Sequence, residues 1–263
     1  EIFAASIPVG SRIISRSGWG ADENILFAIN ETDSSSQSTE ERKGGGSGGT
    51  TSDSRAEACN EDRRKYPKEF DVALTVRKND NSKPYRWALQ YSPSVRMLVV
   101  HHTALSGLGD TRSGIESMRA LYQYHASTLG WRDIGYHYVI DERGNIYEGK
   151  HGGAFVVGGH AYCNNVGTIG IALMGNFEVE EPSQDQVKSL QWLSKELATQ
   201  YNIDLHRGIV FHGKEYASPI VDHEDLLSTL CPGYFLKNVL SQVIVHTRTG
   251  DINAGVIFPT VPG

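Results

Sequence analysis

Two residues near the C-terminal end of the sequence, His223 and Cys231, have side chains that bind zinc well. A neutral imidazole and a thiolate are common zinc ligands, and a catalytic zinc takes three protein ligands while keeping a fourth position for water. The best candidate for the third ligand is the pair His101-His102, which ends the apolar run at residues 96–102. These residue types indicate a catalytic zinc site, although ten histidines in 263 residues make chance combinations easy.

The third ligand depends on how the strand that ends in His101-His102 is oriented. Successive strand residues point to opposite faces of a sheet, so only one of these two histidines can point into a given site. The residues alone leave both choices open.

The elements that would position these residues alternate between strand and helix patterns. The run 96–102 suits a central strand, and residues 113–128 place apolar side chains on one face at helical spacing. A Ser-x-x-Gln capping pattern at 183–186 opens a second helix. Further strands are expected at 136–140, 145–148, 168–174 and 209–212, and a C-terminal helix at 234–246. This alternation predicts an α/β fold with a mixed central β-sheet flanked by helices.

The low-complexity stretch at about 30–58 interrupts this pattern. It has almost no large apolar residues and a Gly/Ser-rich centre, so we expect a flexible loop. Residues 247–263, which are rich in Gly and Pro toward the end, are expected to form a C-terminal tail. We therefore predict one domain over residues 1–246 that carries a long insertion.

The composition excludes two functional classes. The formal net charge is −6 and the pI about 5.9, whereas a nucleic-acid binder usually carries a basic face. No apolar run approaches the ~18 residues that a membrane span needs. We therefore expect neither a nucleic-acid partner nor a membrane-spanning segment.

Several short motifs, taken in order, resemble the peptidoglycan recognition protein family, which shares its fold with the type 2 N-acetylmuramoyl-L-alanine amidases. They cover roughly residues 11–240, interrupted by the insertion, and are specific together rather than singly. The motifs are RSGWGA at 16–21, VVHHTA at 99–104, GWRDIGYHY at 130–138, GHA at 159–161, IGIALMGN at 169–176 and TLCPG at 229–233. The resemblance implies the same mixed sheet flanked by helices.

The resemblance also implies a zinc-dependent amidase and a role for individual residues. The first histidine of the family's motif is a zinc ligand, which maps to His101, and the other ligands map to His223 and Cys231. The family's catalytic tyrosine, after Asp-Ile-Gly, maps to Tyr136, and the polar residue two before the cysteine maps to Thr229. The implied cofactor is Zn²⁺. The implied reaction is hydrolysis of the amide bond between the lactyl group of N-acetylmuramic acid and the L-alanine of the peptidoglycan stem peptide.

Three further residues are candidates for substrate binding. His160 lies in a loop that lines the substrate groove in the family, and its alternative is a solvated loop histidine. Trp131 could stack on sugar or peptide, and its alternative is packing at a helix end. His102 is the third candidate, and its alternative is a packed neighbour of the site. For Tyr136, the alternative to a catalytic role is a core aromatic residue on a half-buried strand.

One motif departs from the family pattern. The family usually has Gly-His-Arg-Asp around the second histidine ligand, whereas this chain has Asp222-His223-Glu224-Asp225. The lost arginine and the added carboxylates raise the local negative charge. That change strengthens metal binding or weakens the binding of a wall peptide, which carries carboxylates itself.

Three functions remain in competition at this stage. The amidase would be secreted or in the cell envelope and would act on bacterial peptidoglycan or muropeptides. The alternative is a non-catalytic receptor for the same ligand, but such receptors commonly replace the cysteine that is present here as Cys231. A zinc peptidase that acts on the stem peptide is a weaker third possibility.

The chain has three cysteines, an odd number for a secreted protein. Because Cys231 is better used as a zinc ligand, we expect a Cys59–Cys163 disulfide. The alternative is three free buried thiols, because only the geometry of the fold decides whether a disulfide closes.

Overall fold

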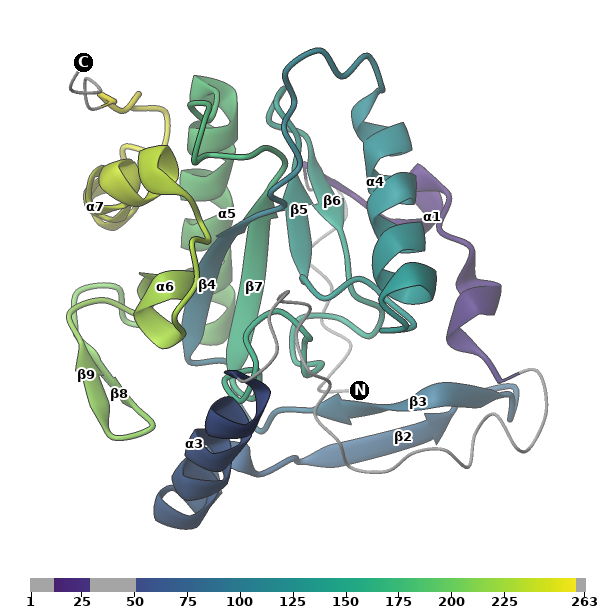
Figure 1. Cartoon of the computed structure of the whole chain (residues 1–263). Helices are drawn as coiled ribbons and strands as arrows, with labels where there is room; N and C mark the ends of the chain where they lie inside the picture. The colour runs from purple at the N-terminus through teal and green to yellow at the C-terminus, as the bar shows by residue number, and fades with distance from the viewer. Residues whose placement is uncertain (1–11, 29–50, 259–263) are drawn as a thin grey trace.

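The computed structural model describes residues 12–28 and 51–258, and its centre is a six-stranded mixed β-sheet (Figure 1). The strand order is β1-β6-β5-β7-β4-β10, and neighbours run parallel except in the antiparallel hairpin of β5 and β6. The strands are β1 (Ile13–Ile14), β4 (Met97–His102), β5 (Tyr138–Ile140), β6 (Ile146–Glu148), β7 (Thr168–Leu173) and β10 (Ile220–Asp222). β4 and β7 are buried along their whole length, so their sequences are mainly continuous apolar runs rather than alternating patterns.

Helices cover both faces of this sheet (Figure 1). α5 and α7 pack on one face, and α4 packs with α1 on the other. The four helices are α1 (Arg16–Trp19), α4 (Gly114–Gln123), α5 (Gln184–Tyr201) and α7 (Tyr234–Thr249). Along β5, Tyr138 and Ile140 belong to the α5/α7 core and Val139 to the α4 core, as the two-residue period of a strand requires. The predicted fold class is confirmed.

Most of the expected elements are present close to their expected bounds. The helix expected at 113–128 is α4 followed by a π-helical turn, Tyr124–Thr128. The capping box at the start of α5 is formed, because Ser183 and Gln186 each accept a hydrogen bond from the other's backbone N–H. The remaining short elements are η2 (Glu23–Leu26), η3 (Pro67–Phe70), β2 (Leu74–Lys78), β3 (Pro84–Tyr91), β8 (Ile209–Phe211), β9 (Lys214–Tyr216) and α6 (His223–Leu226). β8 pairs with β9 in a separate two-stranded ribbon rather than joining the central sheet.

The insertion is partly helical, which corrects the expectation of a flexible loop over 30–58. Residues 51–58 lie in α3 (Thr51–Lys65), whereas residues 29–50 lie outside the described residues. Arg, Ala and Glu recur along the helix, and these residues have a high intrinsic helix propensity. Cys59 is its only buried residue among those whose side chains are described. Periodicity failed to predict α3 because the helix has no apolar stripe to face a core.

The expected tail at 247–263 begins later than predicted. α7 continues to Thr249, and Val256 beyond it is buried against the α5/α7 core. The Val256 backbone also exchanges two hydrogen bonds with the side chain of Gln184 at the start of α5. Residues 247–258 therefore pack on the domain, residues 259–263 lie outside the described residues, and the single-domain division remains a prediction.

A disulfide joins Cys59 of α3 to Cys163 in the loop before β7, as expected from the sequence. It ties the insertion to the central sheet across a sequence separation of 104 residues. A crosslink that closes a loop of about this length reduces the entropy of the unfolded chain by an amount equivalent to ~4.7 kcal/mol.

Removing this disulfide should destabilise the protein. We expect the Cys59→Ala/Cys163→Ala variant to lose about 2–5 kcal/mol of unfolding free energy. Denaturant unfolding of the two proteins measures the loss, and treatment of the unmodified protein with a phosphine reductant should reproduce it. An unchanged transition midpoint with an unchanged slope would contradict the expectation.

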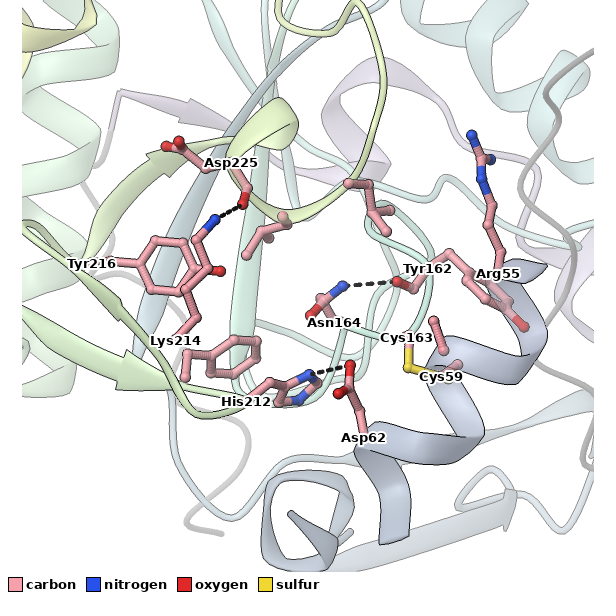
Figure 2. A pocket seen from close by; sticks show the side chains of 14 residues that line it. Arg55, Cys59, Asp62, Tyr162, Cys163, Asn164, His212, Lys214, Tyr216 and Asp225 are labelled. Atoms are coloured by element: carbon pink, nitrogen blue, oxygen red, sulfur yellow. Dashed lines mark hydrogen bonds and ion pairs between the residues drawn. A yellow bond between two sulfur atoms is a disulfide. The ribbon is translucent and has the colours of Figure 1, made fainter. Parts of the chain in front are cut away.

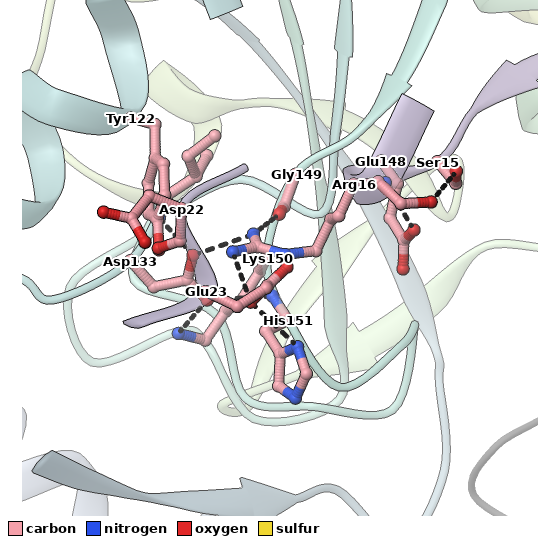
Figure 3. Close-up of polar contacts among 12 residues, drawn as sticks. Ser15, Arg16, Asp22, Glu23, Tyr122, Asp133, Glu148, Gly149, Lys150 and His151 are labelled. Atoms are coloured by element: carbon pink, nitrogen blue, oxygen red, sulfur yellow. Dashed lines mark hydrogen bonds and ion pairs between the residues drawn. The ribbon is translucent and has the colours of Figure 1, made fainter. Parts of the chain in front are cut away.

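A buried arginine anchors the N-terminal segment to the rest of the fold (Figure 3). Arg16 donates from Nη1 to Asp133 Oδ1 at 2.9 Å and to the carbonyl oxygen of Gly149. Its Nε donates to Glu23 Oε1 at 2.7 Å. Asp133 also accepts hydrogen bonds from the backbone N–H groups of Ile134 and His151. Both members of the Arg16–Asp133 pair are about 5% exposed, so each depends on the other for its charge to be tolerated.

Substitution of Asp133 should therefore be costly. Asp133→Ala leaves the buried guanidinium of Arg16 without its buried partner and with only the partly exposed Glu23, and we expect a loss of about 3–5 kcal/mol of unfolding free energy. Glu23→Ala is the matched control, because the Glu23 side chain is 41% exposed and its loss should cost about 1 kcal/mol or less. Equal losses in thermal or denaturant unfolding would show that burial does not govern this network.

Within residues 12–28 and 51–258, none of the helices combines the length and the apolar character needed to cross a membrane.

Candidate metal centre

Three of the predicted site residues converge at one edge of the central sheet. β4 and β10 are adjacent and parallel, with Asp222 in register with Val100, so their C-terminal ends lie together. His101 is near the end of β4, and His223 follows β10 as the first residue of α6. Cys231 reaches the same place from the loop between α6 and α7, and its Sγ lies 3.5 Å from His101 Nδ1. The ligand atoms of the three residues all lie within 4.8 Å of one another.

Strand parity explains why His101 rather than His102 joins this cluster. Leu98 and Val100 point into the α5/α7 core, and His102 has the same parity along β4. His101 therefore points to the opposite face, where its ring centroid lies 4.5 Å from that of His223. The choice that the residues alone left open is made by the packing of the two faces.

The donor set fits a zinc ion. Imidazole nitrogens and cysteine thiolates are both common ligands for this metal, and a catalytic zinc takes three protein ligands. His223 Nε2 is buried and has no hydrogen-bond partner among the described residues, and an atom of this kind needs a ligand to offset its desolvation. The cluster thus contains a buried imidazole nitrogen that a bound metal ion would satisfy.

The protonation states of the cluster also favour a cation. Burial, and then the neighbouring His223, hold the pKa of His101 well below 6.5. Burial lowers the pKa of His223 to about 4. Both imidazoles are thus neutral at pH 7, with lone pairs available for a metal. Burial raises the pKa of the Cys231 thiol to about 12, so its thiolate forms readily only beside a positive charge.

Two hydroxyl groups lie beside the cluster. The ring centroid of Tyr136 is 5.2 Å from that of His101, and its hydroxyl donates to the carbonyl oxygen of His102 at 3.4 Å. Burial raises the pKa of Tyr136 well above its usual value, so the hydroxyl stays protonated and acts as a hydrogen-bond donor. Thr229 Oγ1 accepts a hydrogen bond from the backbone N–H of Cys231 at 3.3 Å, which leaves its own proton available for donation.

Comparison with known proteins identifies the family of this chain. The profile of the N-acetylmuramoyl-L-alanine amidase family matches residues 90–234, which is more than half of the chain. The chain belongs to this family. Peptidoglycan-recognition protein SC2 of Drosophila simulans is 32% identical over 140 residues, which cover 53% of this chain and 69% of the fly protein. An N-acetylmuramoyl-L-alanine amidase of Sus scrofa is 32% identical over 145 residues, covering 54% of this chain but only 22% of the pig protein.

A solved structure supports the fold of this family member. The crystal structure of Drosophila peptidoglycan recognition protein SD superposes with a TM-score of 0.52 and covers 90% of this chain and 95% of that chain. Its sequence identity is 22%, so this likeness concerns the fold alone.

The three predicted substrate-binding residues are placed differently from one another. His160 is 6% exposed, which excludes a solvated loop histidine and places it behind His101 rather than on an open surface. Trp131 is half-buried and packs its ring 4.7 Å from that of His125 near the end of the π-helical turn, which is the helix-end packing considered above. His102 is 5% exposed, and its Nδ1 accepts a hydrogen bond from the backbone N–H of Phe177. Their contacts with substrate remain predictions.

The departure at Glu224 is partly compensated in the fold. Its carboxylate pairs with Lys237 Nζ of α7 at 2.7 Å. Asp222 and Asp225 form a capping box at the start of α6. Lys237 thus offsets one of the three carboxylates around His223, whereas, among the described residues, Asp222 and Asp225 accept hydrogen bonds only from each other's backbone N–H groups and keep their negative charge.

Arg55 of α3 is a residue near the site that the sequence reasoning missed. Its Nη2 donates to the carbonyl oxygen of Ser228 at 3.2 Å, in the loop that carries Thr229 and Cys231. Its positive charge also contributes, after burial and His102, to lowering the pKa of His223. Helix propensity was the only sequence signal that could have indicated an ordered segment here.

A pocket of 230 Å³ separates this part of α3 from α6 (Figure 2). Charged and polar side chains line it from both sides, including Arg55, Asp62, Lys214 and Asp225. Lys214 Nζ donates a hydrogen bond to the carbonyl oxygen of Asp225 at 2.6 Å. α3 therefore supplies a polar wall of this pocket, and Arg55 links it to the loop that carries Thr229 and Cys231.

Proposed function

We propose that this chain is a zinc-dependent N-acetylmuramoyl-L-alanine amidase that hydrolyses the lactyl-amide bond between N-acetylmuramic acid and L-alanine in peptidoglycan. The observation that carries the proposal is the convergence of His101, His223 and Cys231 within 4.8 Å, next to the hydroxyl of Tyr136. A chain that only bound the wall would have no use for a neutral His/His/Cys set with an unsatisfied imidazole nitrogen.

The three convergent residues would hold the metal through two imidazole nitrogens and one thiolate. A bound zinc ion would activate water near neutral pH and polarise the scissile carbonyl group. The chain contributes the neutral state of both histidines through burial. It also contributes a hydrogen bond from the backbone N–H of His102 to Cys231 Sγ at 3.4 Å, which stabilises negative charge on the sulfur.

Tyr136 and Thr229 would act on the charge that develops during the reaction. Attack on an amide carbonyl places negative charge on its oxygen, and preorganised donors aimed at that oxygen lower the barrier. Tyr136 is protonated and is anchored by only one long hydrogen bond, at 3.4 Å, so it can turn toward the substrate at low cost. Thr229 Oγ1 accepts from the Cys231 N–H, and its hydroxyl proton would be the second donor.

Peptidoglycan is the proposed partner, and a secreted or cell-envelope location is proposed with it. The Cys59–Cys163 disulfide supports this location, since structural disulfides persist in oxidising compartments and are rare in the cytosol.

Product analysis tests the proposal. The purified protein is incubated with peptidoglycan, with and without a zinc chelator, and the soluble products are identified by mass spectrometry. We expect intact stem peptides with a free L-alanine amine, and we expect chelation to abolish them. Wall binding without such products at any zinc concentration would indicate the receptor instead, and shortened peptides or free amino acids would indicate a peptidase.

A further inference from the structure

A chain of hydrogen bonds runs from the metal centre into the protein behind it. His101 Nε2 lies 3.0 Å from His160 Nδ1, and His160 Nε2 lies 3.3 Å from Thr168 Oγ1. Thr168 Oγ1 lies 2.8 Å from the carbonyl oxygen of Asn164 and 3.1 Å from that of Asn165. His101, His160 and Thr168 are 1%, 6% and 2% exposed, so water does not compete for these bonds.

The carbonyl groups at the far end set the direction of the whole chain. A carbonyl oxygen only accepts, so the single hydroxyl proton of Thr168 is donated to Asn164 and Asn165. Thr168 Oγ1 must then accept from His160 Nε2–H. A neutral His160 with its proton on Nε2 presents a lone pair at Nδ1, which accepts from His101 Nε2–H. His101 is thereby left with its lone pair on Nδ1, the nitrogen that faces Cys231 Sγ at 3.5 Å.

The site that holds His160 is shaped for an imidazole ring. A Cβ added at Gly170 of β7 would lie 2.4 Å from His160 Cγ, and one added at Gly158 would lie 2.6 Å from its Cδ2. Only glycine leaves room for the ring at these two places. The backbone N–H groups of His160 and Ala161 both donate to Asn165 Oδ1, which fixes the conformation of the loop before β7.

We propose that His160 is a positioning residue that sets the tautomer and ring orientation of His101, so that Nδ1 of His101 faces the metal position. This inference rests on the proposed zinc site and deepens it. This role differs from the substrate binding expected for His160, which stays a prediction. A hydrogen bond of this kind from a ligand histidine to a fixed acceptor commonly changes metal affinity or activity by about 10–100-fold.

Two substitutions at His160 separate the hydrogen bond from the volume of the ring. His160→Leu fills the space but offers no acceptor, and we expect zinc affinity to fall about 10–100-fold. His160→Asn places an amide oxygen close to the position of Nδ1, and we expect it to restore most of that loss. Zinc affinity is measured by competition with a chromogenic chelator, which needs no enzymatic activity.

The metal-free protein provides a second readout. Long-range proton–nitrogen NMR spectra should show His101 protonated at Nε2 in the unmodified protein and a mixture of tautomers in His160→Leu. If His160→Leu fails to fold, Thr168→Val, which has nearly the same shape, takes its place. Without the hydroxyl acceptor, His160 is free to move its proton to Nδ1, so the same NMR change and a smaller loss of zinc affinity are expected.

These outcomes separate the inference from the proposed function. A single Nε2–H tautomer of His101 in the folded variants, with zinc affinity within about twofold of the unmodified protein, would overturn the role of His160. Loss of tautomer control in a protein that binds zinc but releases no stem peptide would support the inference while rejecting the amidase. In a protein that binds no zinc, the tautomer readout still decides the role of His160.

Discussion

Cys231→Ser is expected to remove the metal and nearly all amidase activity. A serine hydroxyl does not ionise near neutral pH, so the proposed site would keep only two imidazole ligands, one fewer than a catalytic zinc requires. The metal contributes several kcal/mol of transition-state stabilisation in such enzymes, which corresponds to a loss of about 10³-fold or more in rate. Zinc content by mass spectrometry and the release of stem peptides from peptidoglycan are measured on the same preparation.

Cys231→Asp provides the matched control for this experiment. A carboxylate is also a zinc ligand, so this variant should retain more zinc and more activity than the serine variant. Circular dichroism and the thermal unfolding midpoint establish that both variants are folded. Full activity of Cys231→Ser without stoichiometric zinc would show that the cluster is not the catalytic centre.

Tyr136→Phe is expected to lower kcat by about 10²–10³-fold, the usual cost of removing one donor to a developing oxyanion. The zinc content should not change, because the tyrosine oxygen is not among the three convergent ligand atoms. Stability should change by about 1 kcal/mol or less, because the hydroxyl makes only one long hydrogen bond. Steady-state kinetics on a soluble muropeptide, together with zinc analysis, test these statements.

Tyr138→Phe is the control for Tyr136→Phe. Tyr138 lies two residues further along and packs in the α5/α7 core, so its hydroxyl is far less suited to act on substrate. We expect this variant to retain kcat within about twofold, since the loss of a hydroxyl group in the core affects mainly stability. If the two variants lose the same activity, the special role of Tyr136 is wrong.

Much of the fold could be predicted because its signals are local. The apolar run that became β4 and the capping box at Ser183 are recognisable within a few residues, and the elements formed close to their expected bounds. α3 was missed because it lacks the local apolar pattern on which these predictions relied. Its stability comes from helix propensity and a disulfide to a residue distant in sequence, and neither produces an apolar period.

The candidate site was predictable in part. The types and approximate spacing of His223 and Cys231 indicated zinc, and the resemblance to a family selected His101 and Tyr136. The buried position of His160 was not predictable, because the segment between β6 and β7 that carries it has no strand or helix period that would indicate which side chains face inward. Its burial depends on space left by Gly170, a residue on a strand that pairs with β4.

The sequence by itself determined the residue types that could bind a metal, the strands and helices that carry them, and the cysteine left over for chemistry. Strand periodicity left His101 and His102 open and the resemblance selected His101, but only the tertiary structure supplies the physical reason, because the choice depends on which side of β4 meets the α5/α7 core. The tertiary structure also decided which nitrogen of His101 faces Cys231. That nitrogen is selected by a hydrogen-bonded chain through His160 and Thr168, whose members meet only when β4 and β7 pair.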